Sequence, residues 1–348
     1  MSAMLGGRHR DGRGHHFLGD THNIDGIMTV GKVASGEFEV VVPLVGLPGA
    51  GGEQLAGVLR EAGAPVLGTS TRTTGVLAVP SYSDQILAAC QFSWRAPPEH
   101  SATLRGDEMA SALADAQLHA LMNGMRSVDL LGVGPGALWF DPWHALLLDL
   151  WTEKIPNFGG AILLWGSPDQ ARHELVRDGV MSLHATALWE NAARSALAAL
   201  AGQRVFVCHW GELLHNPDQS TRALLSFLDG CGLQHSVDSA SLELAFAGAV
   251  EMEAASAEGP EEQAAITAFL SAQTGAHSDF ASSSLGTLSH SAQELLTTQR
   301  ALYRATAEGA EAWRMVDRIR REATTSPAEL AQALAGVDSL VSHLLNLV

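Results

Sequence analysis

The sequence predicts an α/β protein in which helices flank a parallel β-sheet, with a helical extension at the C-terminal end. The first observation is an apolar run at 40–45 that passes into a glycine-rich turn and then into a helical pattern at 53–62, the order in which a parallel α/β sheet begins. The second is that strand, turn and helix recur in this order at 161–178, with the strand at 161–165 and the helix from residue 170, and again at 204–231. The third is that hydrophobic residues make up 46% of the 348 residues, enough for a sizeable core.

Charge and cysteine content narrow the class of protein further. A net charge of −17 argues against nucleic acid and anionic membranes as partners, because both attract basic surfaces. Cys90, Cys208 and Cys231 form no CxxC pair, which favours reduced thiols. No apolar run approaches the roughly 18 residues that a membrane helix needs, and no signal-like segment opens the chain. We therefore expect a cytoplasmic protein.

Three regions divide the chain. Residues 1–36 are polar and rich in glycine, histidine and arginine, so they are expected to form a flexible tail. Their histidines fit no tight spacing of metal ligands, and no metal site is predicted. Residues 37–305 are expected to form the α/β domain, and residues 306–348 to form C-terminal helices whose leucines and valines suit docking or oligomer contact.

Hydrophobic periodicity and turn residues predict the elements within these regions. Beyond those named above, strands are expected to start at Pro65 and to span 75–79 and 128–133, and helices to span 81–97, 108–122, 183–201, 291–304, 310–322 and 327–347. An acidic, Gly/Ser-rich span at 251–284 reads as a loop or lid. Glu190 and Arg194 lie four apart in a predicted helix, so a surface ion pair is expected.

The first glycine-rich turn is the leading candidate for ligand binding. Its residues are Gly46, Pro48, Gly49, Gly51 and Gly52. A glycine turn that opens a helix gathers backbone N–H groups and the positive end of the helix dipole, which suits an anion. The turn lacks the Lys-Ser/Thr ending of a Walker loop, and no cation occurs between residues 40 and 59. Only a weak anion cradle made of backbone is therefore expected.

Residues 204–233, RVFVCHWGELLHNPDQSTRALLSFLDGCGL, resemble the strand, turn and helix of cytosolic and bacterial sulfotransferases. The chain resembles that family in further segments, which follow each other in the same order as in the family. These segments are residues 84–98, 140–151 and 161–175, and SAQELLTTQRALYRA near residue 300. The resemblance covers roughly residues 40–305. It implies a fold similar to that of the P-loop NTPases.

This resemblance implies the cofactor 3′-phosphoadenosine 5′-phosphosulfate (PAPS), but the motifs depart from the family at each cationic position. Pro48–Gly52 stands in place of a "PRSGT" loop, and residues 140–143 (FDPW) stand in place of "KDPR". The family's "R-x-P" turn is GSP at 166–168, and the serine that holds the 3′-phosphate is Glu174. Losing these groups together removes most of the charge-assisted hydrogen bonds that a polyanion needs. We therefore expect no cofactor.

Three functions remain open from the sequence. The first is a repurposed enzyme that tailors a small molecule in bacterial secondary metabolism, for example by promoting displacement or elimination of a sulfate-type leaving group in ring closure. The second is a PAPS-dependent sulfotransferase whose cations come from elsewhere, such as Arg60, Arg72, Arg105 or Arg172. The third is a non-catalytic subunit that pairs with an active sulfotransferase-like protein; a homo- or hetero-oligomer is expected.

The candidate site residues follow from these motifs. For proton transfer the candidates are His100, Asp141 and His144, although Asp141 also suits the N-cap of a helix with Pro142 at its first position. The side chains expected to line a substrate pocket are Trp94, Phe140, Trp143 and Trp165. The aromatic side chains at 140, 143 and 165 lie at or near positions that the family gives to phosphate-binding cations.

Overall fold

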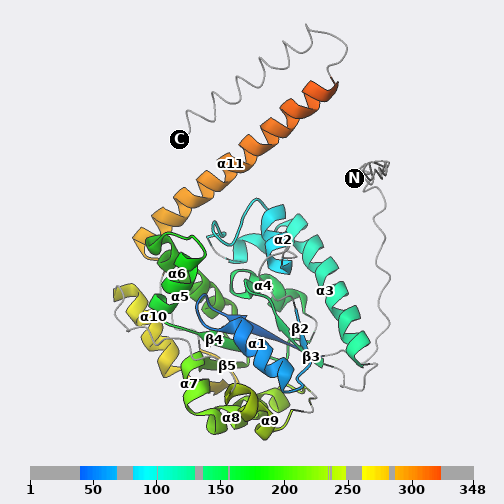
Figure 1. The fold of residues 1–348 in the computed structure, drawn as a ribbon, viewed down its shortest axis with the longest axis vertical. Coiled ribbons are helices and arrows are strands. Elements are labelled where there is room, and N and C mark those ends of the chain that lie inside the picture. Colours follow the sequence, from blue (N-terminus) through cyan, green and yellow to red (C-terminus); the bar gives the residue numbers. More distant parts are fainter. Residues whose placement is uncertain are drawn as a thin grey trace, which may run out of the picture. The chain divides into compact units, whose positions relative to one another are not determined.

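The computed structural model confirms an α/β fold built on a mostly parallel sheet with helices on its faces (Figure 1). It describes residues 40–68, 81–99, 101–129, 136–155, 157–233, 235, 237–247, 261–281 and 287–322. The tail expected at 1–36, the strand expected at 75–79 and the helix expected at 327–347 lie outside these residues.

The sheet of the described residues has six strands in the order β2-β3-β1-β4-β5-β6. The strands are β1 (Val40–Gly46), β2 (Val66–Leu67), β3 (Gly136–Phe140), β4 (Ala161–Trp165), β5 (Val205–His209) and β6 (Gly275–His277). The first five are parallel, and β6 pairs with β5 in the antiparallel direction. In the centre, β1 pairs with β3 from Val40 opposite Gly136 and with β4 from Leu44 opposite Ile162.

The helices cover both faces of this sheet. Right-handed crossovers place on one face α2 (Tyr82–Ala89), α3 (Glu108–Asp129), α4 (His144–Lys154), α5 (Pro168–Arg177) and α6 (Ser182–Ala199). The same rule places α1 (Gly52–Glu61) on the other face, where it packs against α9 (Ser239–Ala247), which in turn packs against α8 (Pro217–Gly230). The remaining helices are the 3-10 turn Ser101–Leu104, α7 (Trp210–His215), α10 (Glu261–Ala272) and α11 (His290–Glu322).

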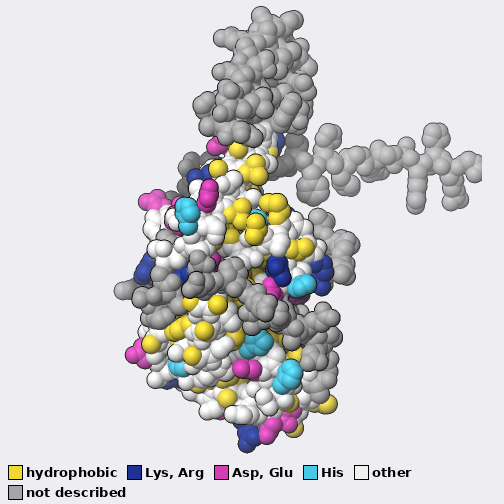
Figure 2. Space-filling model, turned by 90° about the vertical axis from the view of Figure 1, so that its left-hand side faces the viewer, with side chains coloured by type: hydrophobic (Ala, Val, Ile, Leu, Met, Phe, Trp, Pro, Cys, Tyr) yellow, Lys and Arg dark blue, Asp and Glu magenta, His cyan; other side chains and the backbone are white. Residues whose placement is uncertain are grey.

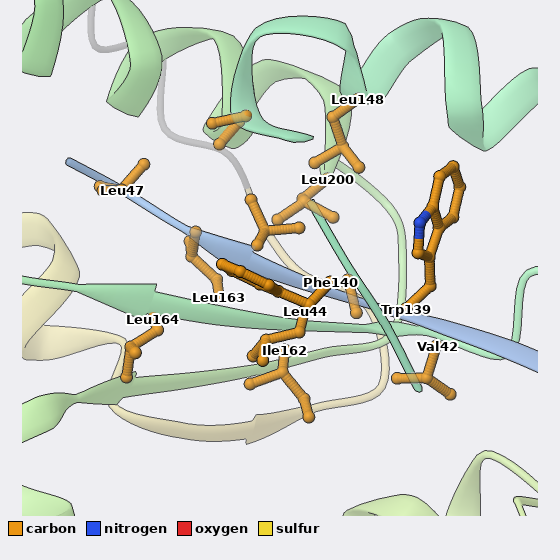
Figure 3. Close-up of a cluster of buried hydrophobic side chains, with 14 of the residues drawn as sticks. Val42, Leu44, Leu47, Trp139, Phe140, Leu148, Ile162, Leu163, Leu164 and Leu200 are labelled. Atoms are coloured by element: carbon orange, nitrogen blue, oxygen red, sulfur yellow. The ribbon is translucent and has the colours of Figure 1, made fainter. Parts of the chain in front are cut away.

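The core lies between the sheet and these helices (Figure 3). Val42 and Leu44 of β1, Trp139 of β3 and Leu163 of β4 are fully buried. Because helices cover both faces, the central strands are apolar at nearly every position, as in other parallel sheets. A second cluster joins α5, α6 and the first turns of α11 through Leu175, Leu188 and Leu296, among others.

The structure corrects the strand that the sequence placed at 128–133. Helix α3 runs on to Asp129, and the strand is Gly136–Phe140, directly before the turn that leads into α4. All five residues of β3 are buried. A strand buried on both faces shows no alternation of apolar and polar residues, so periodicity alone does not separate it from a buried helix.

Two expectations near the C-terminal end are also corrected. Within the span read as a loop or lid, Glu261–Ala272 form a helix and Gly275–His277 form the antiparallel edge strand. The helices expected at 291–304 and 310–322 are one continuous helix, α11, so no break separates residues 305 and 306. Gly309 is tolerated inside this helix, where a glycine costs about 1 kcal/mol relative to alanine.

Glu190 is buried, whereas a surface ion pair had been expected. Its side chain is 0% exposed, and its carboxylate accepts a hydrogen bond from the Arg194 Nε at 3.0 Å. It also accepts hydrogen bonds from the backbone N–H and the hydroxyl of Ser289, at 2.7 and 2.8 Å. Ser289 directly precedes α11, so this buried carboxylate joins α6 to the start of α11.

Large hydrophobic side chains on the described surface are scattered over several helices. They are Met109, Val176, Met181, Leu183, Leu244 and Leu302. On the face drawn in Figure 2, exposed hydrophobic side chains lie among charged ones. None of the helices in the described part of the chain has the length and apolar character to cross a membrane.

Candidate functional site

A cleft of about 900 Å³ opens where the central strands end. Its walls come from the β1–α1 loop, from α2 and the turn after it, from the β3–α4 turn, and from the end of α5, with Tyr303 of α11 beside them. After β1 the chain crosses towards one edge of the sheet to form β2, and after β4 it crosses in the opposite direction to form β5. Ligands of open α/β sheets bind beside such a divergence, at the carboxyl ends of the strands.

The β1–α1 loop lines this cleft through all five residues singled out in the sequence. Gly49 and Gly51 adopt left-handed backbone conformations, with φ angles of 75° and 74°. A Cβ atom on Gly49 would lie 2.4 Å from the backbone nitrogen of Ala171 in α5, closer than real Cβ atoms come. The resembled family carries its arginine at this position. In this chain the position is packed against another backbone and has no room for a side chain.

Phe140 covers the first turn of α1. A Cβ atom on Gly52 would lie 3.0 Å from the Cε2 atom of the Phe140 ring, and one on Gly46 would lie 3.1 Å from the Cα of Gly52. In the resemblance drawn from the sequence, Phe140 takes the place of a lysine and Gly52 that of a threonine. An aromatic ring therefore borders the helix N-terminus that would otherwise receive an anion.

Asp141 is buried, with 1% of its surface exposed, and the expected role as helix cap is corrected, because the N-cap of α4 is Trp143. One carboxylate oxygen accepts a hydrogen bond from the backbone N–H of Ser83 in the first turn of α2, at 3.1 Å. The other accepts one from the N–H of Trp143, directly before α4, at 3.0 Å. The side chain thus joins the starts of two helices, and α4 begins at His144, two residues after Pro142.

His144 lies in the core and not in the lining of the cleft. Its Nδ1 is 3.3 Å from the carbonyl oxygen of Leu44, and its ring meets Trp139 edge-on with 4.4 Å between centroids. Burial lowers the pKa of His144, opposed by the nearby Asp141 carboxylate and the Leu44 carbonyl. Burial therefore favours the neutral form of this imidazole. The third proton-transfer candidate, His100, lies outside the described residues.

Three of the four aromatic candidates line the cleft, and the fourth lies outside this lining. Trp94 and Trp143 both line the cleft and stack on each other, with 4.6 Å between ring centroids and 6° between planes. Phe140 also lines the cleft. Trp165 does not belong to this lining; it is 5% exposed and packs edge-on against His209, 4.7 Å between centroids.

Asp84 is a cleft residue that the sequence analysis missed. It is half-buried in the first turn of α2, where its backbone N–H donates to the Ser81 hydroxyl at 3.0 Å and its carboxylate accepts from that hydroxyl at 3.1 Å. Burial raises the pKa of Asp84, and the neighbouring Asp141 carboxylate adds to the rise, while hydrogen bonds from Ser81 and the Trp143 side chain oppose it. The Ser-x-x-Asp pattern predicts a helix cap but not a position in a cleft.

The charges that line the cleft are mostly negative. Among the described residues, the lining includes four carboxylates, Glu53, Asp84, Glu174 and Asp178, and one guanidinium, that of Arg177. Arginines that could have supplied cations for a nucleotide are placed elsewhere. Arg105 pairs with Glu153 and Arg172 with Asp169. Arg60 lies in the last turn of α1, at the opposite end from the loop, and Arg72 is outside the described residues.

Neither metal ligands among the described residues nor comparison with known proteins adds a further assignment to the cleft. Within the described residues, no group of three or more His, Cys, Asp or Glu side chains is placed to hold a metal ion. No family model matches the chain, and no match to a curated protein is found.

Proposed function

We propose that the chain is a sulfotransferase-like protein whose cleft does not take PAPS and acts instead on a different small molecule. The observation that carries this proposal is the sign of the charges lining the cleft, four carboxylates against one guanidinium among the described residues. A glycine loop follows the first strand and lies where the strand connections diverge, and this supports the likeness to sulfotransferases.

Two features of the loop oppose a phosphosulfate in addition to this charge. Gly49 has no space for the family's arginine, and Phe140 covers the glycine that replaces the family's threonine. Each charge-assisted hydrogen bond that is lost removes about 1.5–3 kcal/mol of binding free energy. Because a micromolar dissociation constant corresponds to about 8 kcal/mol, the loss of several contacts leaves no useful affinity for a polyanion.

Asp84 is the residue we propose for proton transfer. It lines the cleft and is half-buried, and burial raises its pKa, which makes the carboxylate a stronger base. In a ring closure, it would take the proton of a hydroxyl nucleophile while the new C–O bond forms. A sulfate on the attacked carbon would leave with the bonding electrons, held by Arg177 and the loop backbone.

Thermal unfolding of the full chain with 3′,5′-adenosine bisphosphate tests the proposal. We expect no change of the melting temperature at millimolar nucleotide, because only a ligand that binds the folded state raises it. The matched variant is Arg177→Ala. A shift in the wild type that disappears in Arg177→Ala would show a nucleotide site with unusual contacts, and the proposal would then be wrong.

A further inference from the structure

The cleft has the chemistry of a site for positive charge. We propose that its ligand is an organic cation, an amine or quaternary ammonium on an aliphatic or aromatic body, bound between the Trp94–Trp143 pair and Asp84. This inference rests on the proposed function, because it assigns a ligand class to the same cleft.

The aromatic wall is the first support. Trp94 and Trp143 stack nearly parallel and both border the cleft. The faces of indole rings carry negative electrostatic potential and attract cations within about 6 Å. The chain itself already places a cation on this pair, because the guanidinium of Arg95 lies 4.7 Å from the centroid of Trp94.

The charge next to this wall is the second support. The Trp143 indole and the Asp84 carboxylate both line the cleft, and the indole is close enough to lower the pKa of Asp84, so an acid and an indole ring lie together at one side of the cleft. Glu174 and Asp178, at the end of α5, also line the cleft and have the same sign. An ammonium group in this space is attracted by these carboxylates, and a sulfate on the same molecule would lie towards Arg177 and the loop.

The size of the cleft is the third support. Its volume of about 900 Å³ lies within the usual range for small-molecule sites and far exceeds one ammonium group. Apolar side chains, among them Leu47, Phe92 and Leu175, supply further lining. The cation is therefore expected to carry a hydrophobic body.

Isothermal titration of the full chain with permanent ions tests the inference. Choline and its uncharged isostere 3,3-dimethylbutan-1-ol differ only in charge at the quaternary centre. Benzyltrimethylammonium and phenyl sulfate offer the same ring with opposite charges. We expect each cation to bind at least about tenfold more tightly than its counterpart, a difference that one well-placed charged contact supplies.

Variants locate the site. Asp84→Asn should weaken benzyltrimethylammonium about tenfold, and Trp143→Leu about 3- to 30-fold. Glu294→Gln removes an equal charge from an exposed position on α11 outside the cleft lining and should leave the affinity unchanged. Circular dichroism of each variant shows that it is folded before its affinity is compared.

Each contrary result has a distinct meaning. Equal affinity for choline and its isostere would overturn the inference, as would an Asp84→Asn variant that is folded and binds the cation like the wild type. Tighter binding of phenyl sulfate would also overturn it and would favour a sulfate-bearing substrate. If no probe binds and the adenosine bisphosphate does not bind either, the cation is refuted while the exclusion of PAPS stands. Binding of the bisphosphate would refute the proposed function itself.

Discussion

The close packing of Gly49 against α5 can be tested by adding a single methyl group. In Gly49→Ala the new Cβ atom meets the backbone nitrogen of Ala171 at 2.4 Å, and alanine must adopt a φ angle of 75°. The left-handed conformation costs a non-glycine residue about 1–2 kcal/mol, and overpacking adds about 1–3 kcal/mol. We therefore expect the free energy of unfolding to fall by about 2–5 kcal/mol.

Gly57→Ala is the matched control for this substitution. Gly57 lies within α1, and a Cβ atom there would meet nothing within 4 Å. Alanine should stabilise the helix by about 0.5–1 kcal/mol. Equilibrium unfolding in urea, followed by tryptophan fluorescence, gives both values from midpoint and slope. If Gly49→Ala is as stable as the wild type, the loop does not pack against α5 as described, and the family's arginine would have room there.

Three further predictions concern buried or half-buried charges. Glu190→Ala should lower the free energy of unfolding by about 3–5 kcal/mol, because Arg194 and Ser289 lose a buried partner. Urea unfolding measures this loss, and a loss below about 1 kcal/mol would contradict a buried Glu190–Arg194 pair. Burial lowers the pKa of His144, so protonation of this side chain opposes the folded state. As pH falls below about 6.5, the wild type should therefore lose stability relative to His144→Phe, by at most about 1.4 kcal/mol per pH unit. Parallel pH profiles of the two proteins would contradict this. Because the pKa of Asp84 is raised, affinity for benzyltrimethylammonium should decrease as pH falls through the pKa of Asp84, and this decrease should be smaller in Asp84→Asn. The other charged groups of the described lining are Glu53, Glu174, Asp178 and Arg177, and the Asp141 carboxylate also acts on Asp84; equal pH slopes in calorimetry would exclude Asp84 as the cause.

Elements with local signals could be predicted from the sequence. Strand β4 was expected at 161–165 and is found there. The helix after it begins at Pro168, two residues before the expected start, because Ser167 and Gln170 form a capping box that fixes its first turn. Strand β5 and helix α6 before it also follow from apolar runs and turn residues, whereas the turn expected after β5 holds α7 and the start of α8. Such signals act over a few residues, so they can be read from a single sequence.

Features that depend on distant segments could not be predicted. Strand β3 is a strand because β1 and β2 pair with it, and its own residues suit a buried helix equally well. Glu190 was expected on the surface because nothing local indicates that the segment before α11 covers it. In the cleft, the glycine loop and Trp143 were found from their motifs. Asp84 and Arg177 were missed because only the fold brings α2 and the end of α5 beside that loop.

The most direct test of the central claim is a calorimetric titration of the wild-type chain with 3′,5′-adenosine bisphosphate, beside one with benzyltrimethylammonium under the same conditions. Among the described residues the cleft is lined by four carboxylates and one guanidinium, with an aromatic ring over the first turn of α1, which predicts no measurable binding of the bisphosphate and saturable binding of the cation. Micromolar binding of the bisphosphate, abolished in Arg177→Ala, would contradict the claim and identify the chain as a nucleotide-binding protein.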